Sequence, residues 1–135
     1  MGEEIMEVTI PDGVRVEARY KGFTIQTDQP LKAGGTNSAP SPFDLFLASL
    51  GTCAGYFVAA FCQERQIRTA GISLSMRIGR NPETRMVGKI AIQISLPPGF
   101  PEKYKRAVIK AADQCTVKNH LANPPAFEMT AEIRS

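Results

Sequence analysis

Residues 45–62 form a run of eighteen positions without a single charged side chain, although 21% of the residues of this chain are charged. The run predicts a helix that begins with a capping serine and a proline at Ser41-Pro42 and ends near residues 65–66. A helix that is apolar around its whole circumference is either buried on every side or lies in a membrane. We favour burial, because several glycines, alanines and hydroxyl side chains make the run only weakly hydrophobic, and we expect no membrane association.

Short segments on both sides of this helix alternate apolar and polar residues, which is the pattern of half-buried strands. The alternation predicts strands over residues 6–10, 14–20, 23–25, 72–78, 90–96 and 127–133. Residues 29–42 are rich in proline and glycine and are expected to form a long loop, a kind of segment that is often functional. Residues 101–117 repeat apolar side chains at helical spacing and predict a second helix.

The resulting order, β-β-β-α-β-β-α-β, indicates an α+β fold in which antiparallel sheets pack on two helices, in one domain over residues 1–135. A second helix and six strands in a chain of 135 residues offer little cover for a helix that is apolar all round. We therefore expect a homodimer with the first helix near the subunit interface. Gly51 and Gly55, four positions apart, are interpreted as a place of close helix packing.

Composition excludes several classes of function. The net charge is only +3, and the basic residues are scattered, so we expect no nucleic-acid binding. One histidine and dispersed cysteines offer no metal-ligand spacing, and no cofactor is expected. The first ten residues are acidic where a secretory signal would be basic, which favours a cytoplasmic location. In such a reducing compartment three cysteines indicate reactive or buried thiols rather than a disulfide framework.

Two cysteines occupy inward positions of the two expected helices. Cys53 lies in the first helix and Cys115 near the end of the second, whereas Cys62 points to nearly the opposite side from Cys53. These positions are consistent with two roles for the cysteines, as small apolar residues of the core or as reactive thiols. The side of Cys53 is shared by apolar and small residues, which would form a pocket: Ser49, Leu50, Tyr56, Phe57 and Ala60.

An apolar pocket raises the pKa of a thiol and makes it inert. Cys53 is also about three turns inside its helix, which is too deep for the helix N-terminus to stabilise a thiolate. A reactive Cys53 therefore requires a cation from elsewhere. Arg15 and Arg19, on one face of the second strand, are the candidates, and Arg19 is preferred.

Two motifs resemble a known family. Residues 41–53, Ser-Pro-Phe-Asp-Leu-Phe-Leu-Ala-Ser-Leu-Gly-Thr-Cys, resemble a signature of the OsmC/Ohr family of osmotically induced and organic hydroperoxide resistance proteins. Residues 115–121, Cys-Thr-Val-Lys-Asn-His-Leu, resemble its second-cysteine motif. The segment Asp28-Gln29-Pro30, followed by Gly34-Gly35, is similar to the OsmC-like branch of the family.

The resemblance implies an intertwined homodimer with two central helices wrapped by β-sheets and a thiol peroxidase site at the subunit interface. It identifies Cys53 as the peroxidatic cysteine and Cys115 as the resolving cysteine, with an organic hydroperoxide as substrate and an external dithiol as reductant. Two positions depart from the hydroperoxide resistance branch. Phe43 stands where that branch has an acid, with Asp44 one place later, and Arg19 is only a near neighbour of its arginine position.

Two alternatives to the peroxidase remain open. One is a non-enzymatic dimer that binds a small apolar ligand in the same pocket, with the cysteines as packing residues. The other is a hydrolase that pairs one of the two cysteines with His120, the only histidine, although no oxyanion motif is visible.

Overall fold

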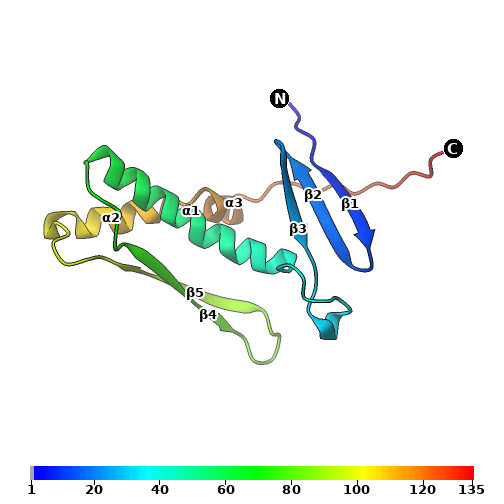
Figure 1. Ribbon diagram of the computed structural model, residues 1–135, viewed down its shortest axis with the longest axis horizontal. Coiled ribbons are helices and arrows are strands. Elements are labelled where there is room, and N and C mark those ends of the chain that lie inside the picture. Colours follow the sequence, from blue (N-terminus) through cyan, green and yellow to red (C-terminus); the bar gives the residue numbers. More distant parts are fainter. Residues whose placement is uncertain (1) are drawn as a thin grey trace. The chain divides into compact units, whose positions relative to one another are not determined.

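Glycine turns and alternating side chains set up a sheet at the N-terminal end of the chain. The computed structural model of the protein describes residues 2–135. Its first three strands are β1 (Glu7–Asp12), β2 (Arg15–Tyr20) and β3 (Phe23–Thr27), paired antiparallel in that order (Figure 1). Gly13 and Gly22 adopt φ values of 51° and 83° in the two connecting turns, a backbone region in which glycine avoids the strain of a side chain. The strands predicted over residues 6–10, 14–20 and 23–25 are therefore confirmed.

The loop after β3 is held by one buried carboxylate. The side chain of Asp28 is 1% exposed, and its Oδ2 accepts hydrogen bonds from the backbone N–H and hydroxyl groups of both Thr36 and Ser38. The hydrogen bonds from Ser38 hold the pKa of Asp28 far below its usual range. Gly35 is required here, because a Cβ at this position would lie 2.0 Å from the carbonyl oxygen of Gln29. The loop predicted over residues 29–42 is thus present, with one 3₁₀ turn at Leu31–Ala33.

The long helix α1 spans Pro42–Glu64, close to its predicted limits. Ser41 caps it, since its Oγ accepts the backbone N–H of Asp44 at 3.2 Å. By length and a mean hydropathy of 1.8, α1 could cross a membrane, but a core helix passes the same test. One side of the helix is buried, at Leu47, Leu50, Ala54, Val58, Phe61 and Cys62.

The chain forms two compact units, divided between Ala48 and Ser49. In the second unit, β4 (Ser73–Arg80) and β5 (Val87–Ser95) form a two-stranded antiparallel sheet. The glycines of α1 face this sheet, because a Cβ at Gly51 would lie 2.7 Å from Sδ of Met76 and one at Gly55 would lie 4.0 Å from Leu74. Our expectation that another helix packs against these glycines is corrected: side chains of strand β4 pack against them instead.

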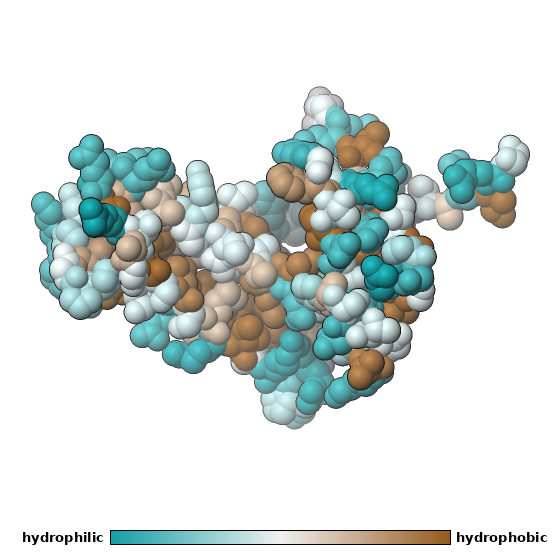
Figure 2. Space-filling view, viewed as in Figure 1, coloured by the Kyte–Doolittle hydropathy of each residue, from teal (hydrophilic) through white to brown (hydrophobic). Residues whose placement is uncertain are grey.

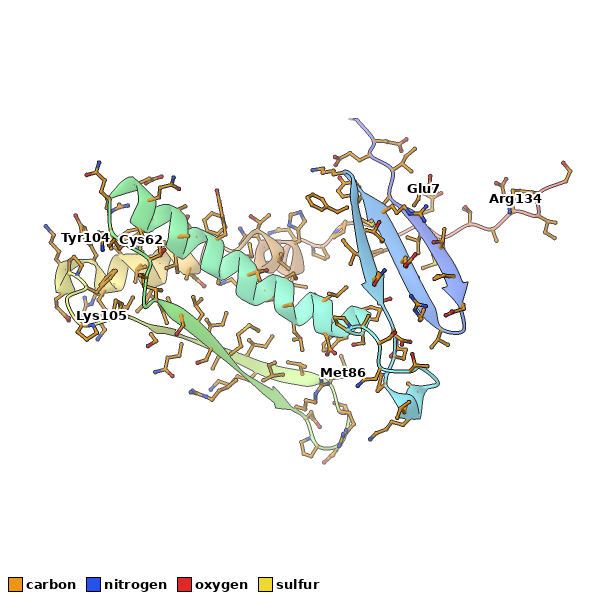
Figure 3. All side chains as sticks on the ribbon, viewed as in Figure 1. Glu7, Cys62, Met86, Tyr104, Lys105 and Arg134 are labelled. Carbon is orange, nitrogen blue, oxygen red and sulfur yellow. The ribbon has the colours of Figure 1, made fainter. Side chains whose placement is uncertain are left out.

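The core of the second unit joins α1 to the helix α2 (Lys105–Ala112). Val58, Phe61 and Cys62 of α1 pack with Val108 of α2, and strand and loop residues surround this cluster. The rings of Phe61 and Tyr104 meet edge to face, with centroids 5.7 Å apart. Figure 3 shows Cys62 and Tyr104 beside each other at this end of α1.

The second helix predicted over residues 101–117 is wrong as one continuous element. A 3₁₀ turn at Glu102–Tyr104 leads into α2, and a separate helix α3 spans Thr116–Ala122. Cys115, with φ −52° and ψ 119°, has a non-helical backbone, so the helical hydrogen-bond ladder does not continue through it. Cys115 is therefore the N-cap of α3 rather than an inward residue at the end of a long helix.

The strand predicted over residues 127–133 is also not formed. The segment after α3 is extended and exposed, and it pairs with no other strand among residues 2–135 (Figure 1). A strand needs a hydrogen-bonding neighbour, and the alternating pattern alone does not supply one. The α+β class and the antiparallel sheets are confirmed without this last element.

Candidate functional site

The start of α3 brings the two predicted cysteines together. Cys53, in the middle of α1, is half-buried, and its Sγ accepts the backbone N–H of Thr116 at 3.2 Å. Thr116 directly follows Cys115, so the cap of one helix meets the middle of another. Cys53 and the segment that begins with Cys115 come close together because the chain breaks between α2 and α3. Only the start of a new helix presents free backbone N–H groups.

Cys115 is the more buried of the two thiols, with 4% of the residue exposed. Its Sγ accepts the backbone N–H of Lys118 at 3.3 Å, which is the usual task of a serine or threonine cap. Its S–H donates to the carbonyl oxygen of Leu50 in α1, with Sγ 4.0 Å from that oxygen. Both Cys53 and Cys115 are free thiols. Cys115 is thus fixed by α3 on one side and by α1 on the other.

The pKa of the Cys53 thiol is lowered from its usual range. The main cause is hydrogen bonding from the backbone N–H of Val117, and the Cys115 thiol and Thr116 contribute further. Partial burial raises the pKa but does not outweigh these donors. The thiolate is the nucleophilic form of cysteine, so the site favours the reactive state of Cys53.

Cys62 has the opposite environment. It is fully buried in the core of the second unit, and burial raises the pKa of its thiol despite the nearby charge of Arg65. The guanidinium of Arg65 lies over the ring of Phe61, 3.7 Å from the centroid, and donates to the Phe61 carbonyl. Cys62 is a packing residue, in contrast to Cys53.

The cation expected at Cys53 is not needed to lower its pKa in this chain. Backbone N–H groups at residues 116 and 117 stabilise the thiolate, contrary to our expectation that only a cation would do so. Arg19 is an exposed residue of β2, where it pairs with Glu7 and Thr24 across the sheet. The guanidinium of Arg15 lies 3.4 Å from the carboxylate of Asp12. The catalytic role of Arg19 stays a prediction.

The predicted pocket residues differ in exposure. Leu50 is buried, Ser49 and Phe57 are half-buried, and Tyr56 is 64% exposed with its ring edge-on to Phe57. Phe43 and Asp44, in the first turn of α1, are exposed. Leu50 contacts the cysteine site through its carbonyl oxygen.

The hypothesis of a hydrolase that uses His120 gains nothing from the geometry. Nδ1 of His120 lies 2.8 Å from the carbonyl oxygen of Thr116, one turn earlier in α3, so the ring binds its own helix. Among residues 2–135, no three metal-ligating side chains gather into a potential site. The contacts that sequence reasoning missed are the backbone donors of Thr116 and Val117. The polar pair Asp113-Gln114 before Cys115 was the available signal of a helix break.

Comparison with known protein families shows to which family this chain belongs. Residues 35–130 match the family model of the OsmC-like proteins, which is more than half of the chain. The chain belongs to the OsmC-like protein family. The OsmC/Ohr resemblance of its two cysteine motifs is therefore confirmed. No curated protein gives a significant match to this chain.

Solved structures share the fold of this OsmC-like protein at low sequence identity. A Psychrobacter arcticus protein described as an osmotic stress induced and detoxification response protein is 24% identical over 88% of each chain, with a TM-score of 0.74. An organic hydroperoxide resistance protein OsmC of Legionella pneumophila is 18% identical over 87% of each chain, with a TM-score of 0.55. One of Elizabethkingia anophelis is 18% identical over 91% of each chain, with a TM-score of 0.58. These likenesses support the fold.

Proposed function

We propose that this OsmC-like protein is a cysteine-based peroxidase that reduces organic hydroperoxides in oxidative stress defence. The observation that carries the proposal is the hydrogen bond from the Thr116 N–H to Cys53, directly beside the second cysteine and together with a lowered pKa of the Cys53 thiol. The printed names of the Legionella and Elizabethkingia structures, organic hydroperoxide resistance proteins, point to the same substrate class.

In the first step the thiolate of Cys53 attacks the outer oxygen of the hydroperoxide. An S–O bond forms, the O–O bond breaks, and the alkoxide leaves and takes a proton to become the alcohol. Cys53 is oxidised to a sulfenic acid while the peroxide is reduced. The backbone donors at Thr116 and Val117 favour this step because they lower the pKa of Cys53 and so favour its thiolate form.

In the second step the Cys115 thiol attacks the sulfur of the Cys53 sulfenic acid. A disulfide forms and one water leaves, so Cys53 is protected from further oxidation. An external dithiol then reduces the disulfide by exchange and is itself oxidised to a disulfide. In this scheme Cys115 is the resolving cysteine. The contacts of Cys115 with Lys118 and Leu50 hold it beside Cys53 in the reduced state.

The substrate specificity follows from the side chains proposed around Cys53. Leu50, Tyr56 and Phe57 are apolar or aromatic, and Phe43 replaces the acid of the hydroperoxide resistance branch. Apolar groups favour an organic peroxide over hydrogen peroxide, since burying its hydrocarbon part is favourable. Ser49 and Asp44 complete the proposed lining, and Arg19 is the proposed cation that approaches the site in the assembled protein.

We further propose that the active form is a homodimer located in the cytoplasm. Thr52, Tyr56 and Ala59 form an exposed stripe on one side of α1, even though this helix carries no charge between residues 45 and 62. A second copy packed on this stripe would remove it from water, which is favourable for Tyr56 in particular.

The test is a count of thiols and an intact mass before and after one equivalent of cumene hydroperoxide. The expected result is the loss of two thiols and about two mass units, with a new link that peptide mapping assigns to Cys53 and Cys115. The Cys53→Ser variant should consume no peroxide. Cys115→Ser should complete one turnover with the first equivalent, and further equivalents of cumene hydroperoxide should oxidise the Cys53 sulfenic acid to sulfinic acid.

Cys62→Ala is the matched control, because it removes a thiol from the core without touching the site. It should keep peroxide consumption and lose only stability, by about 1 kcal/mol. Three thiols that stay unreactive toward the hydroperoxide in the unmodified protein would overturn the proposal. The remaining interpretation would then be a dimer that binds a small apolar ligand.

A further inference from the structure

The residue after the second cysteine presents two hydrogen-bond donors to Cys53. The backbone nitrogen of Thr116 lies 3.2 Å from the Sγ of Cys53, and the hydroxyl of Thr116 donates to the same sulfur. The N–H is fixed by the backbone, whereas a hydroxyl group rotates about its own bond and also accepts hydrogen bonds. The hydroxyl can therefore change its partner during a reaction, and the N–H cannot.

Contacts on both sides fix the position of Thr116. Cys115 accepts the N–H of Lys118 and donates to the carbonyl oxygen of Leu50 in α1. The carbonyl oxygen of Thr116 itself lies 2.8 Å from Nδ1 of His120. Threonine is β-branched, so few values of its χ1 angle are allowed. The hydroxyl is thus held in the site by the local structure rather than carried on a long flexible side chain.

A small molecule reaches this pair of residues from the solvent. Thr116 is exposed and Cys53 is half-buried. Hydrophobic residues also lie on the surface of the second unit, among its hydrophilic ones (Figure 2). Tyr56 and Phe57, one turn after Cys53 in α1, present aromatic rings on the same side of this helix. A hydroperoxide at Cys53 therefore finds a hydroxyl for its oxygen atoms and aromatic rings for its hydrocarbon part.

The first step of the peroxidase reaction moves negative charge from sulfur to oxygen. Before the step the charge is on the Cys53 thiolate, and after it the charge is on the oxygen that leaves with the hydrocarbon group. A donor that stays on the sulfur stabilises the reactant at least as well as the transition state, and such an interaction does not accelerate the step. A donor that follows the charge to the leaving oxygen does accelerate it, because an alkoxide is a strongly basic leaving group.

We propose that the hydroxyl of Thr116 is a catalytic group that donates to the leaving oxygen of the organic hydroperoxide. This role rests on the proposed peroxidase function and gives the side chain of Thr116 a part in its chemistry. The electron pair of the Cys53 thiolate forms the S–O bond, the outer oxygen keeps its hydrogen, and the pair of the broken O–O bond passes to the leaving oxygen. The hydroxyl of Thr116 gives its proton to that oxygen and takes a proton from water, which leaves as hydroxide.

Two substitutions of Thr116 that keep the backbone N–H test the role of the hydroxyl. Thr116→Val keeps the branched shape and removes the hydroxyl, whereas Thr116→Ser keeps the hydroxyl. Thr116 is exposed, so neither substitution should prevent folding. The measurement is the second-order rate constant for loss of the Cys53 thiol to cumene hydroperoxide, by rapid quenching and mass spectrometry. Thr116→Val should lower it about tenfold or more, and Thr116→Ser should stay within about threefold of the unmodified protein.

Labelling with iodoacetamide separates this effect from the ionisation of Cys53. All rates are compared at a pH on the plateau of each labelling profile, where Cys53 is fully ionised in every variant. Iodide is a weakly basic leaving group and needs no donor, so Thr116→Val should change the labelling rate less than about threefold. A fall in labelling equal to the fall in the peroxide rate would assign the effect to the access or nucleophilicity of Cys53 and overturn the proposal.

The choice of peroxide tests where the hydroxyl acts. Peracetic acid loses acetate, which is far less basic than the alkoxide lost from cumene hydroperoxide, so its reaction has less need of a donor at the leaving oxygen. Thr116→Val should therefore slow the reaction with peracetic acid less than about threefold. Equal slowing with the two peroxides at one pH would contradict donation to the leaving oxygen.

The unmodified protein distinguishes this proposal from the proposed function. If its thiols stay unreactive toward cumene hydroperoxide, the peroxidase is overturned, and the role of Thr116 with it. If the unmodified protein loses two thiols and Thr116→Val reacts at the same rate, the role of Thr116 alone is overturned.

Discussion

The pKa of the Cys53 thiol is lowered by backbone N–H groups rather than by a charged side chain. Because its pKa is lowered in the folded protein, the folded state holds Cys53 ionised at pH values where the unfolded chain still binds the proton. This thiol therefore stabilises the fold above the unfolded pKa, and the contribution is lost as the pH falls through the folded value. Cys62 has a raised pKa and destabilises the fold as the pH rises above its unfolded value.

The Thr116→Pro variant tests this origin of the lowered pKa. Proline has no N–H, so the hydrogen bond to Cys53 is removed, while proline is well tolerated at the first position of a helix. Cys115, with ψ 119°, already has the backbone that precedes a proline. We expect the pKa of Cys53 to rise toward its ordinary value, because one of the hydrogen bonds to its thiolate is lost. The rate of iodoacetamide labelling of Cys53 as a function of pH, followed by mass spectrometry, measures it.

Thr116→Ala is the control, because it keeps the N–H and removes only the hydroxyl. Its labelling profile should move upward by much less than that of Thr116→Pro. Cys62 should stay unlabelled in both variants as long as the protein is folded, since it is fully buried. Equal shifts in the two variants would assign the effect to the hydroxyl group and contradict the role of the backbone donor.

The contact between α1 and β4 depends on a glycine at one position and not at the other. Gly55→Ala should stabilise the protein by about 1 kcal/mol, because alanine favours a helix and its Cβ would meet Leu74 at an ordinary 4.0 Å. Gly51→Ala brings its Cβ to 2.7 Å from the sulfur of Met76, which must move. That repacking should cancel the helix gain. Urea unfolding measures both variants, and a stabilisation of Gly51→Ala equal to that of Gly55→Ala would contradict the close contact.

Helix α1 shows what the sequence could predict. Its start follows from local chemistry, a serine cap and a proline at the first position, and the structure places both there. The strands β1 to β5 follow from alternation and glycine turns in the same way. These signals are local, so they survive without knowledge of the tertiary structure.

The break before α3 was not predictable from periodicity, because Cys115 lies on the same helical stripe as Val108. What decides the break is the backbone conformation of Cys115, which lets its sulfur cap α3. The hydrogen bonds that lower the pKa of Cys53 follow from this break and were missed for the same reason. The prediction of a strand over residues 127–133 was wrong for a different reason. Its alternating pattern is clear, but no strand partner lies within residues 2–135.

Apolar surface lies in water on several elements of the chain, among them α1 at Tyr56 and the C-terminal segment at residues 127–133. A single copy gains nothing from this exposure, whereas association removes it from water. If the folded state is a dimer, its unfolding depends on protein concentration, because dilution favours the dissociated chains. A protein without association would show one unfolding curve at every concentration.

We therefore expect the urea concentration at the unfolding midpoint to rise with protein concentration. The apparent free energy of unfolding should increase by about 1.4 kcal/mol for each tenfold increase in protein concentration. A chain that ends at Asn123 separates the two surfaces. If the C-terminal segment supplies most of the contact, this shorter chain should lose the concentration dependence and keep the core around Val58 and Val108. If pairing of α1 dominates, the dependence should remain, and substituting the exposed Tyr56 by glutamate should then remove it. A full-length midpoint that does not change with concentration would contradict the homodimer as a whole.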